Sequence, residues 1–102
     1  MWSPKRRIVD PAARAMASRA QFRQLGSAAD FWLEALDEQV RIDPESGRQV
    51  FKDNQWVRWI KRPFDLPQGG QLICRVYYRY TDSEVQWLKF TWGTVNVCLQ
   101  GK

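Results

Sequence analysis

The residues of this chain that could do chemistry are basic side chains interleaved with aromatic rings. They are concentrated in residues 56–62, 71–81 and 85–91. Arg and Lys neutralise phosphates, and aromatic rings stack on nucleic-acid bases. Eleven of the 16 basic residues are Arg, and the net charge is +5. This pattern favours a polyanionic partner, either RNA, DNA or an acidic protein, although a basic surface with no specific partner accounts for the charge about equally well.

Other kinds of site are disfavoured by the residues the chain lacks. It has no His and only two Cys, Cys74 and Cys98. Ser-His-Asp and Cys-His triads are therefore excluded, and two thiols alone do not make a structural zinc site. We expect no metal and no cofactor. The two cysteines lack CxxC spacing, which indicates reduced thiols, with a disulfide between strands as the less favoured alternative.

The length and the apolar pattern predict one domain over residues 1–102. No apolar run approaches the roughly 18 residues that a membrane helix needs, and no secretory signal is visible, so we expect a cytoplasmic location without membrane contact. A weak first strand is predicted at residues 5–9. The pair Asp10-Pro11 then predicts a helix over residues 12–25, with Met16, Ala20 and Phe22 as its thin apolar stripe.

The second half of the chain predicts a second helix followed by strands. The helix begins after Ser27, and its apolar positions are Ala28, Phe31, Trp32, Ala35, Leu36 and Val40. From Gln49 the apolar period changes to two, which is typical of strands. The strands are predicted at residues 49–52, 56–62, 71–81, 85–91 and 95–99, with breaks at Pro63 and Gly93. The fold class expected is therefore α+β, with two N-terminal helices packed on an antiparallel sheet of 3–5 strands.

The two longest strands predict a hairpin with two different faces. A loop of three residues, 82–84, would set Val76 opposite Phe90 on an apolar face, and Tyr78 opposite Leu88. On the other face Arg79 would lie opposite Trp87 and Tyr77 opposite Lys89. These are cation–aromatic pairs, and Arg75 extends the row. The same pairs could simply cover an open sheet face without binding anything.

Parts of this sequence resemble the RelE/ParE superfamily of bacterial toxins. The string Arg75-Val-Tyr-Tyr-Arg79-Tyr80-Thr81, followed by Val85 and Trp87-Leu88, looks like the central hairpin of that family. Asp43-Pro44-Glu45 resembles the loop after its second helix. The residues Lys52-Asp53, Trp56 and Arg58 look like the approach strand of the YhaV-type branch. The resemblance covers roughly residues 22–93, and it departs from the family after Gly93, where Thr94, Val95 and Asn96 stand in place of Arg or Lys.

The resemblance implies a metal-independent endoribonuclease that cleaves mRNA as the toxin of a toxin–antitoxin pair. Its partners would then be RNA or the ribosome, and an antitoxin protein. It also implies which residues act. The catalytic set is expected to be Arg75, Arg79 and Lys61, with nucleic acid bound by Arg58, Arg62, Tyr77, Trp87 and Lys89.

A second hypothesis from the same residues is a binding protein without enzymatic activity. A small protein of a phage or mobile element could use a basic aromatic sheet face to engage nucleic acid or an unidentified host protein. Trp and Arg dominate the energetics of protein interfaces. The anchors would then be Trp2, Trp56, Trp59 and Trp87. A homodimer formed through the second helix or an edge strand is compatible with either hypothesis.

Overall fold

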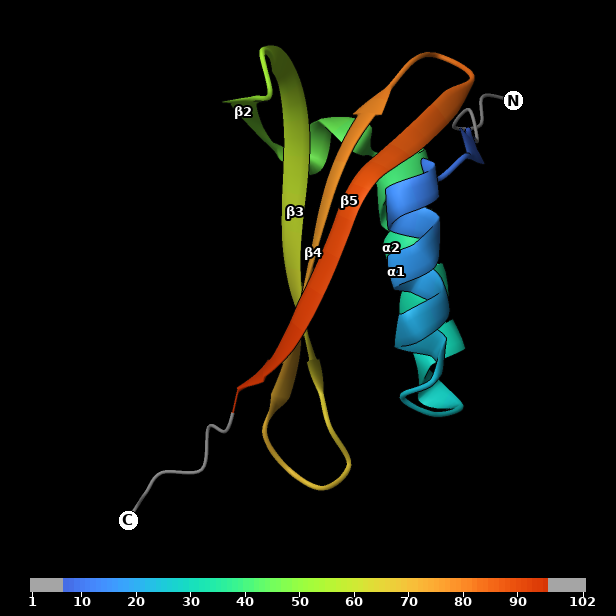
Figure 1. Ribbon diagram of the computed structural model, residues 1–102, viewed down its shortest axis with the longest axis vertical. Coiled ribbons are helices and arrows are strands. Elements are labelled where there is room, and N and C mark those ends of the chain that lie inside the picture. Colours follow the sequence, from blue (N-terminus) through green and yellow to red (C-terminus); the bar gives the residue numbers. More distant parts are fainter. Residues whose placement is uncertain (1–6, 96–102) are drawn as a thin grey trace, which may run out of the picture.

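The computed structural model describes residues 7–95 of the chain, and it consists of two helices and a sheet (Figure 1). The first strand and the helices are β1 (Ile8–Val9), α1 (Ala13–Arg23) and α2 (Ala28–Ile42). After a short 3₁₀ turn, η1 (Pro44–Ser46), come β2 (Arg48–Lys52), β3 (Gln55–Asp65), β4 (Gln71–Tyr80) and β5 (Glu84–Val95). Among these residues no helix is both long and apolar enough to cross a bilayer.

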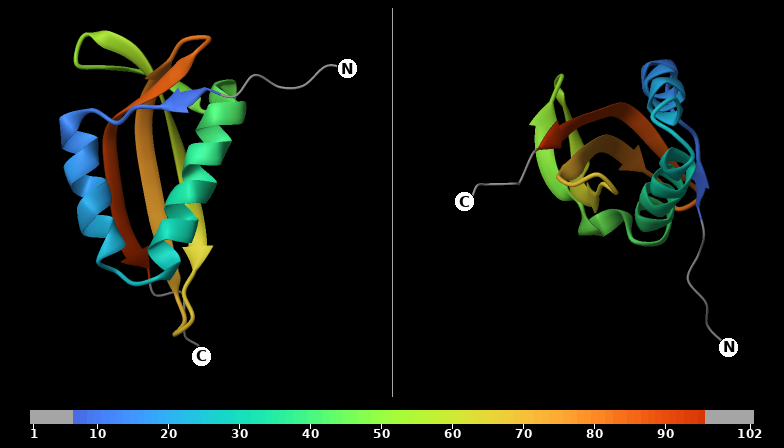
Figure 2. Two further views of the ribbon diagram at one scale, coloured as in Figure 1. Left: turned by 90° about the vertical axis from the view of Figure 1, so that its right-hand side faces the viewer. Right: turned by 90° about the horizontal axis from the view of Figure 1, so that it is seen from below.

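The sheet has five strands in the order β1-β5-β4-β3-β2. Neighbouring strands are antiparallel, except that β1 runs parallel to β5. Both helices lie on the same side of the sheet (Figures 1 and 2). The α+β class and the order of helices before strands are therefore confirmed. The expectation of a wholly antiparallel sheet is wrong at β1, because the chain crosses over through both helices and the other strands before β5 forms.

The core lies between the helices and the inner face of β3, β4 and β5, which we call the helix face. Phe22 of α1 is at its centre, with ring centroids 5.1 Å from Phe90 and 5.2 Å from Trp92. Burying such large rings supplies most of the apolar area of a small domain. The fully buried side chains with the greatest volume are Trp87, Tyr78, Phe22, Phe90, Leu33, Leu36, Leu72, Val40, Val76, Val85 and Cys74.

Both helices bury only part of the apolar stripe that was predicted. In α1 the buried residues are Ala15, Arg19 and Phe22, whereas Met16 is 55% exposed. In α2 they are Ala29, Leu33, Leu36 and Val40, so the predictions for Leu36 and Val40 are confirmed, whereas Phe31 is 73% exposed. Asp10 does not cap α1, because its backbone N–H donates to Val85 O and the chain follows β5 until Ala12. A thin apolar stripe leaves the rotation of a helix undecided until the sheet is in place.

Two predicted strand ends are also wrong. The strand β3 continues through Pro63 to Asp65, and β5 continues through Gly93 to Val95. Pro63 lies beyond Trp59, the last residue of β3 that pairs with β2, so β3 is an edge strand there and its missing N–H breaks no ladder. Of the strand predicted at residues 95–99, only Val95 lies within the described residues.

A β-bulge decides which side chains of β5 are buried. Tyr77 pairs with Lys89, but the next residue, Tyr78, pairs with Trp87, so Leu88 has no partner in β4. A bulge adds one residue to one strand and reverses the alternation beyond it. Trp87 therefore points to the helix face, as Phe90 does. The predicted pairing of Tyr78 with Leu88 is wrong, while that of Val76 with Phe90 is confirmed.

A candidate nucleic-acid interface on the open face

The side of the sheet away from the helices, which we call the open face, brings together most of the expected site. Residues paired across antiparallel strands point to the same side of a sheet. Lys61 is paired with Arg75, and Tyr77 with both Trp59 and Lys89. The open face therefore contains all three residues expected to be catalytic. Its basic and aromatic members are Arg48, Lys52, Trp59, Lys61, Arg75, Tyr77, Arg79 and Lys89.

Three residues of the expected set lie elsewhere. Trp87 is completely buried on the helix face, so the prediction that it pairs with Arg79 is wrong; Gln86 takes that place. Arg58 and Arg62 pair with Tyr78 and Cys74, which also point to the helices. These residues therefore do not share a surface with Arg75.

The two misplaced arginines have structural partners. Arg58 Nη1 donates to Gly47 O at 2.8 Å and to Glu45 O at 3.3 Å, which ties η1 and the turn after it to β3. Arg62 Nη1 donates to Gln39 Oε1 at 3.4 Å, and its guanidinium lies over the ring of Phe64 at 5.1 Å. Both guanidinium groups therefore help to hold the sheet against the α2 side of the molecule.

The aromatic centre of the open face is a stacked pair, Trp59 and Tyr77. Their ring centroids are 6.0 Å apart, and their planes differ by 20°. Lys52 Nζ lies 5.2 Å from the centroid of the Tyr77 ring. Trp59 was expected only as an anchor of the non-enzymatic binding protein, and Lys52 was not expected at a nucleic-acid site. A sequence signal for both residues exists. A two-residue turn at residues 53–54 sets Arg48 opposite Trp59, and the alternation of Arg48, Val50 and Lys52 then puts Lys52 on the same side of the sheet as Trp59.

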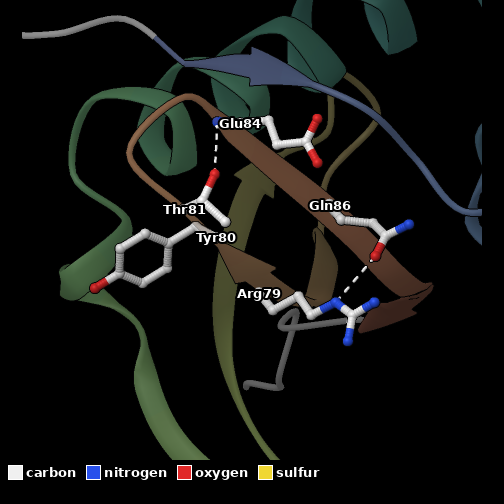
Figure 3. Close-up of a pocket in the computed structure, with 5 residues that line it drawn as sticks. All are labelled: Arg79, Tyr80, Thr81, Glu84 and Gln86. Carbon is white, nitrogen blue, oxygen red and sulfur yellow. Dashed lines mark hydrogen bonds between the residues drawn. The ribbon is translucent and has the colours of Figure 1, made fainter.

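Arg79 is fixed in position at one end of the open face. Its Nε donates to Gln86 Oε1 at 3.0 Å, and its Nη1 donates to Gln55 Oε1 at 3.2 Å. Figure 3 shows the first of these bonds and the hollow beside it, which has a volume of about 350 Å³ and is lined by Arg79, Tyr80, Thr81, Glu84 and Gln86. Because side-chain amides and not carboxylates hold the guanidinium, its positive charge is oriented without being neutralised.

A small cavity lies where the tip of the β2–β3 hairpin meets the bulge of β5. Its volume is about 50 Å³, comparable to one tetrahedral oxyanion. Three cations from three different elements line it, namely Arg14 of α1, Lys52 of β2 and Lys89 of β5. Within residues 7–95 none of the three forms an ion pair. The other lining residues are Asp53, Gln55, Val57, Tyr77 and Leu88.

Acidic side chains are confined to the margins of the open face. Asp53 is in the hairpin turn, and Glu84 is the first residue of β5. Asp65 ends β3, where its Oδ1 accepts a hydrogen bond from Gln71 Nε2 at 3.2 Å. Cations therefore outnumber carboxylates on this face, and only Asp53 lies beside Lys52 and Lys89, which favours an anionic ligand.

Two groups that could act as nucleophiles, Cys74 and Tyr78, lie on the other side of the sheet. Cys74 is buried and free, and burial raises the pKa of its thiol to about 12. Burial also raises the pKa of Tyr78 to about 12, although the Gly47 backbone and Arg58 act in the opposite direction. Its Oη keeps its proton and donates to Pro44 O at 2.5 Å. Both groups therefore stabilise the fold and are not available to a ligand of the open face.

Two further groups of residues bear on the alternatives. Trp56 is 64% exposed and packs edge-on against Phe51, with ring centroids 5.3 Å apart. Trp2 and Cys98 lie outside the described residues. Within residues 7–95 no group of three or more Cys, Asp or Glu side chains is arranged to hold a metal ion.

Comparison with known proteins gives no relative for this chain: no family model matches it, and neither does any curated protein or solved structure. What the open face can bind must therefore be inferred from its own chemistry. It offers cations and one aromatic stack on the strands of the sheet, and a cavity of oxyanion size that Arg14 of α1 also lines.

Proposed function

We propose that the protein binds single-stranded RNA on its open face. The observation that supports this most directly is the set of six cations that share that face with the Trp59–Tyr77 stack, with acidic residues only at its margins. Cations bind the phosphates of a nucleic-acid strand, and aromatic side chains stack on its bases. A base can stack on a protein ring only when it is unpaired, which favours a single strand over a duplex.

The spacing of the cations suits consecutive phosphates. Lys61 and Arg75 are neighbours across β3 and β4, so they can hold one phosphate between them. Lys89 is the partner of Tyr77, two residues further along β4 and therefore roughly 7 Å away. Consecutive phosphates of an extended strand are separated by a similar distance. The cavity between Arg14, Lys52 and Lys89 would hold the second phosphate, with a base against the stack. The resemblance to RelE/ParE toxins favours RNA over DNA as the nucleic acid that is bound on the open face.

The binding test is the fluorescence anisotropy of a labelled single-stranded RNA of about ten nucleotides. Arg75→Gln and Lys89→Gln should each weaken binding and reduce the slope of log affinity against log salt by about one. Arg23→Gln is the matched control, because it removes the same charge from an exposed position on α1. Equal losses in all three variants, or tighter binding of a duplex, would overturn the proposal. An affinity that does not change between roughly 50 and 200 mM salt would indicate a protein partner instead.

A second candidate function is cleavage of the bound RNA, as in a RelE/ParE-like toxin. The observation that favours it is Asp53, which lines the same cavity as Lys52 and Lys89. The 2′-hydroxyl would give its proton to the Asp53 carboxylate and attack the adjacent phosphorus. The bond to the 5′-oxygen then breaks, and this oxygen takes a proton from water, which leaves a 2′,3′-cyclic phosphate and a 5′-hydroxyl. The cations would stabilise the charge that develops on the phosphate oxygens.

Cleavage can be separated from binding by one substitution. Asp53 has a φ of 54°, a conformation that Asn also tolerates, so Asp53→Asn should preserve the turn. If the protein is a ribonuclease, this variant should bind RNA normally in the presence of EDTA but yield no cyclic phosphate ends. Expression of the wild type should then arrest growth, and Arg75→Ala should relieve the arrest. RNA that stays intact with the bound wild-type protein would show that binding is the whole function.

A further inference from the structure

The outer edge of β2 has no partner strand among the described residues. The strand is the last in the sheet, and Figure 1 shows it at the margin of the molecule, on the far side of the sheet from the helices. Its residues are Arg48, Gln49, Val50, Phe51 and Lys52. An unpaired edge presents backbone N–H and C=O groups that can bind another extended chain.

The hairpin turn determines which of these groups are free. Asp53 and Asn54 have φ values of 54° and 63°, which is the conformation of a two-residue type I′ turn. In such a hairpin the residues flanking the turn, Lys52 and Gln55, form a hydrogen-bonded pair. Hydrogen-bonded and non-bonded pairs alternate along an antiparallel ladder. Gln49 and Phe51 therefore direct their backbone N–H and C=O groups away from β3, toward solvent.

The side chains beside this edge differ in character between the two sides of the sheet. On the open face are two cations, Arg48 and Lys52. On the other side Phe51 and Trp56 form an edge-on aromatic pair, and they are 58% and 64% exposed. A strand added to β2 would therefore meet positive charge with one set of alternate side chains and aromatic surface with the other.

A second copy of this chain fits the edge poorly. Antiparallel pairing of two β2 strands over their full length is centred on Val50. It sets Arg48 of each copy opposite Lys52 of the other. Like charges directly opposite one another destabilise a strand pair. Both copies also have a net charge of +5, and joining them would place two basic open faces side by side.

From these contacts we propose that the β2 edge binds an extended acidic segment of another protein as an added strand. Backbone hydrogen bonds to Gln49 and Phe51 would supply part of the affinity. Carboxylates at alternate positions would face Arg48 and Lys52, and the intervening apolar side chains would pack on Phe51 and Trp56. Main-chain bonds of this kind give affinity, and the alternate side chains give specificity.

The test uses the full chain and a labelled peptide of about eight residues in which Glu and Val alternate. We expect saturable binding in fluorescence anisotropy, measured without RNA, and slower hydrogen exchange at the amides of Gln49 and Phe51. Gln49→Pro should weaken binding by at least about tenfold, because it removes an outward N–H without breaking a bond to β3. Gln49→Ala is the matched control and should bind like the wild type. Trp56→Ala should also weaken binding.

Three results would overturn the proposal. The first is equal binding of a peptide with Lys in place of Glu. The second is equal binding of the acidic peptide by Gln49→Pro, which would show simple attraction to the open face. The third is a dimer in sedimentation equilibrium that Gln49→Pro dissociates, which would assign the edge to a second copy. None of these results depends on RNA binding, so failure here and failure of the proposed function are distinguishable.

Discussion

Tyr78 and Trp87 lie opposite each other across β4 and β5, and both side chains are completely buried. The Trp87 ring lies under the guanidinium of Arg19, whose Cζ is 4.4 Å from the ring centroid. This pairing exists only because Leu88 bulges out of β5. In the neighbouring pair, Tyr77 and Lys89, the side chain of Lys89 therefore faces away from the helices and contributes to the open face. The bulge thus separates the core from the proposed binding surface.

The first prediction concerns this bulge. Deleting Leu88 should restore a regular ladder in which Trp87 still pairs with Tyr78 and Lys89 still pairs with Tyr77. We expect the free energy of unfolding to change by less than about 2 kcal/mol. Deleting Lys89 instead gives the same chain length and the same ladder, but sets Leu88 opposite Tyr77. Urea denaturation should show similar stability for the two deletions.

RNA binding should distinguish the same two deletions. The chain without Leu88 keeps the cation at the open face, whereas the chain without Lys89 loses it. We therefore expect weaker RNA binding only from the second. If deleting Leu88 unfolds the protein, the bulge is required for the twist of the sheet and the simple register argument is wrong.

The second prediction concerns the ion pair between α1 and α2. Arg19 donates to both carboxylate oxygens of Asp37, at 2.8 and 3.0 Å, and the two side chains are only 10% and 13% exposed. Asp37→Ala should cost about 3–5 kcal/mol of stability, because it leaves a buried guanidinium unpaired. Replacing both residues, as in Arg19→Met with Asp37→Leu, should recover most of this loss. Chemical denaturation of the wild type and these two variants measures the loss and its recovery.

A surface ion pair provides the control. Arg23 and Asp30 join the same two helices at 3.1 Å, but their side chains are 50% and 73% exposed. Asp30→Ala should cost less than about 1 kcal/mol, because exposed pairs contribute little. A similar cost for Asp30→Ala and Asp37→Ala would contradict the importance of the buried pair.

The third prediction concerns Gly47, which is buried against Tyr78. A Cβ at this position would be too close to the Tyr78 hydroxyl and 3.1 Å from Trp59 O. Gly47 has a φ of −76°, which any residue can adopt, so the cost of Gly47→Ala is steric. We expect a loss of about 1–3 kcal/mol. Tyr78→Phe removes the clashing hydroxyl, so the double variant should be more stable than the sum of the two single losses predicts.

The fourth prediction concerns alkaline pH. Burial raises the pKa of Cys74 from 9.0, and that of Tyr78 from 10.0, to about 12 in each case. In the unfolded chain both groups ionise earlier, so the folded state binds more protons above pH 9. The contribution of these two groups to the free energy of unfolding is therefore fully present below pH 9, and it should be lost as pH rises toward 12. Urea midpoints measured across this range should show the fall, and Cys74→Ala should make it shallower. Stability that is independent of pH above 9 would contradict the burial of both groups.

The sequence by itself determined the order of the elements and the charge of the molecule. Alternation along β4 is a local property, since Leu72, Cys74, Val76 and Tyr78 are all apolar and all point to the core. The same alternation correctly assigned Arg75 and Tyr77 to the opposite face. The composition also shows directly that the chain has no His, which excludes Ser-His-Asp and Cys-His catalytic triads.

The tertiary structure alone decided which of the remaining residues share a surface. Whether Arg58 and Lys61 face the helices or the open side depends on the register between β3 and β4, which β3 does not specify because both of its sides are mixed. The position of Trp87 depends on one bulged residue, and a single insertion reverses every side chain beyond it. The cavity joins Arg14, Lys52 and Lys89, which come together only when helix, hairpin and sheet are packed. Local periodicity therefore fixes the direction of a side chain within a strand, but contacts between distant segments decide what lies next to it.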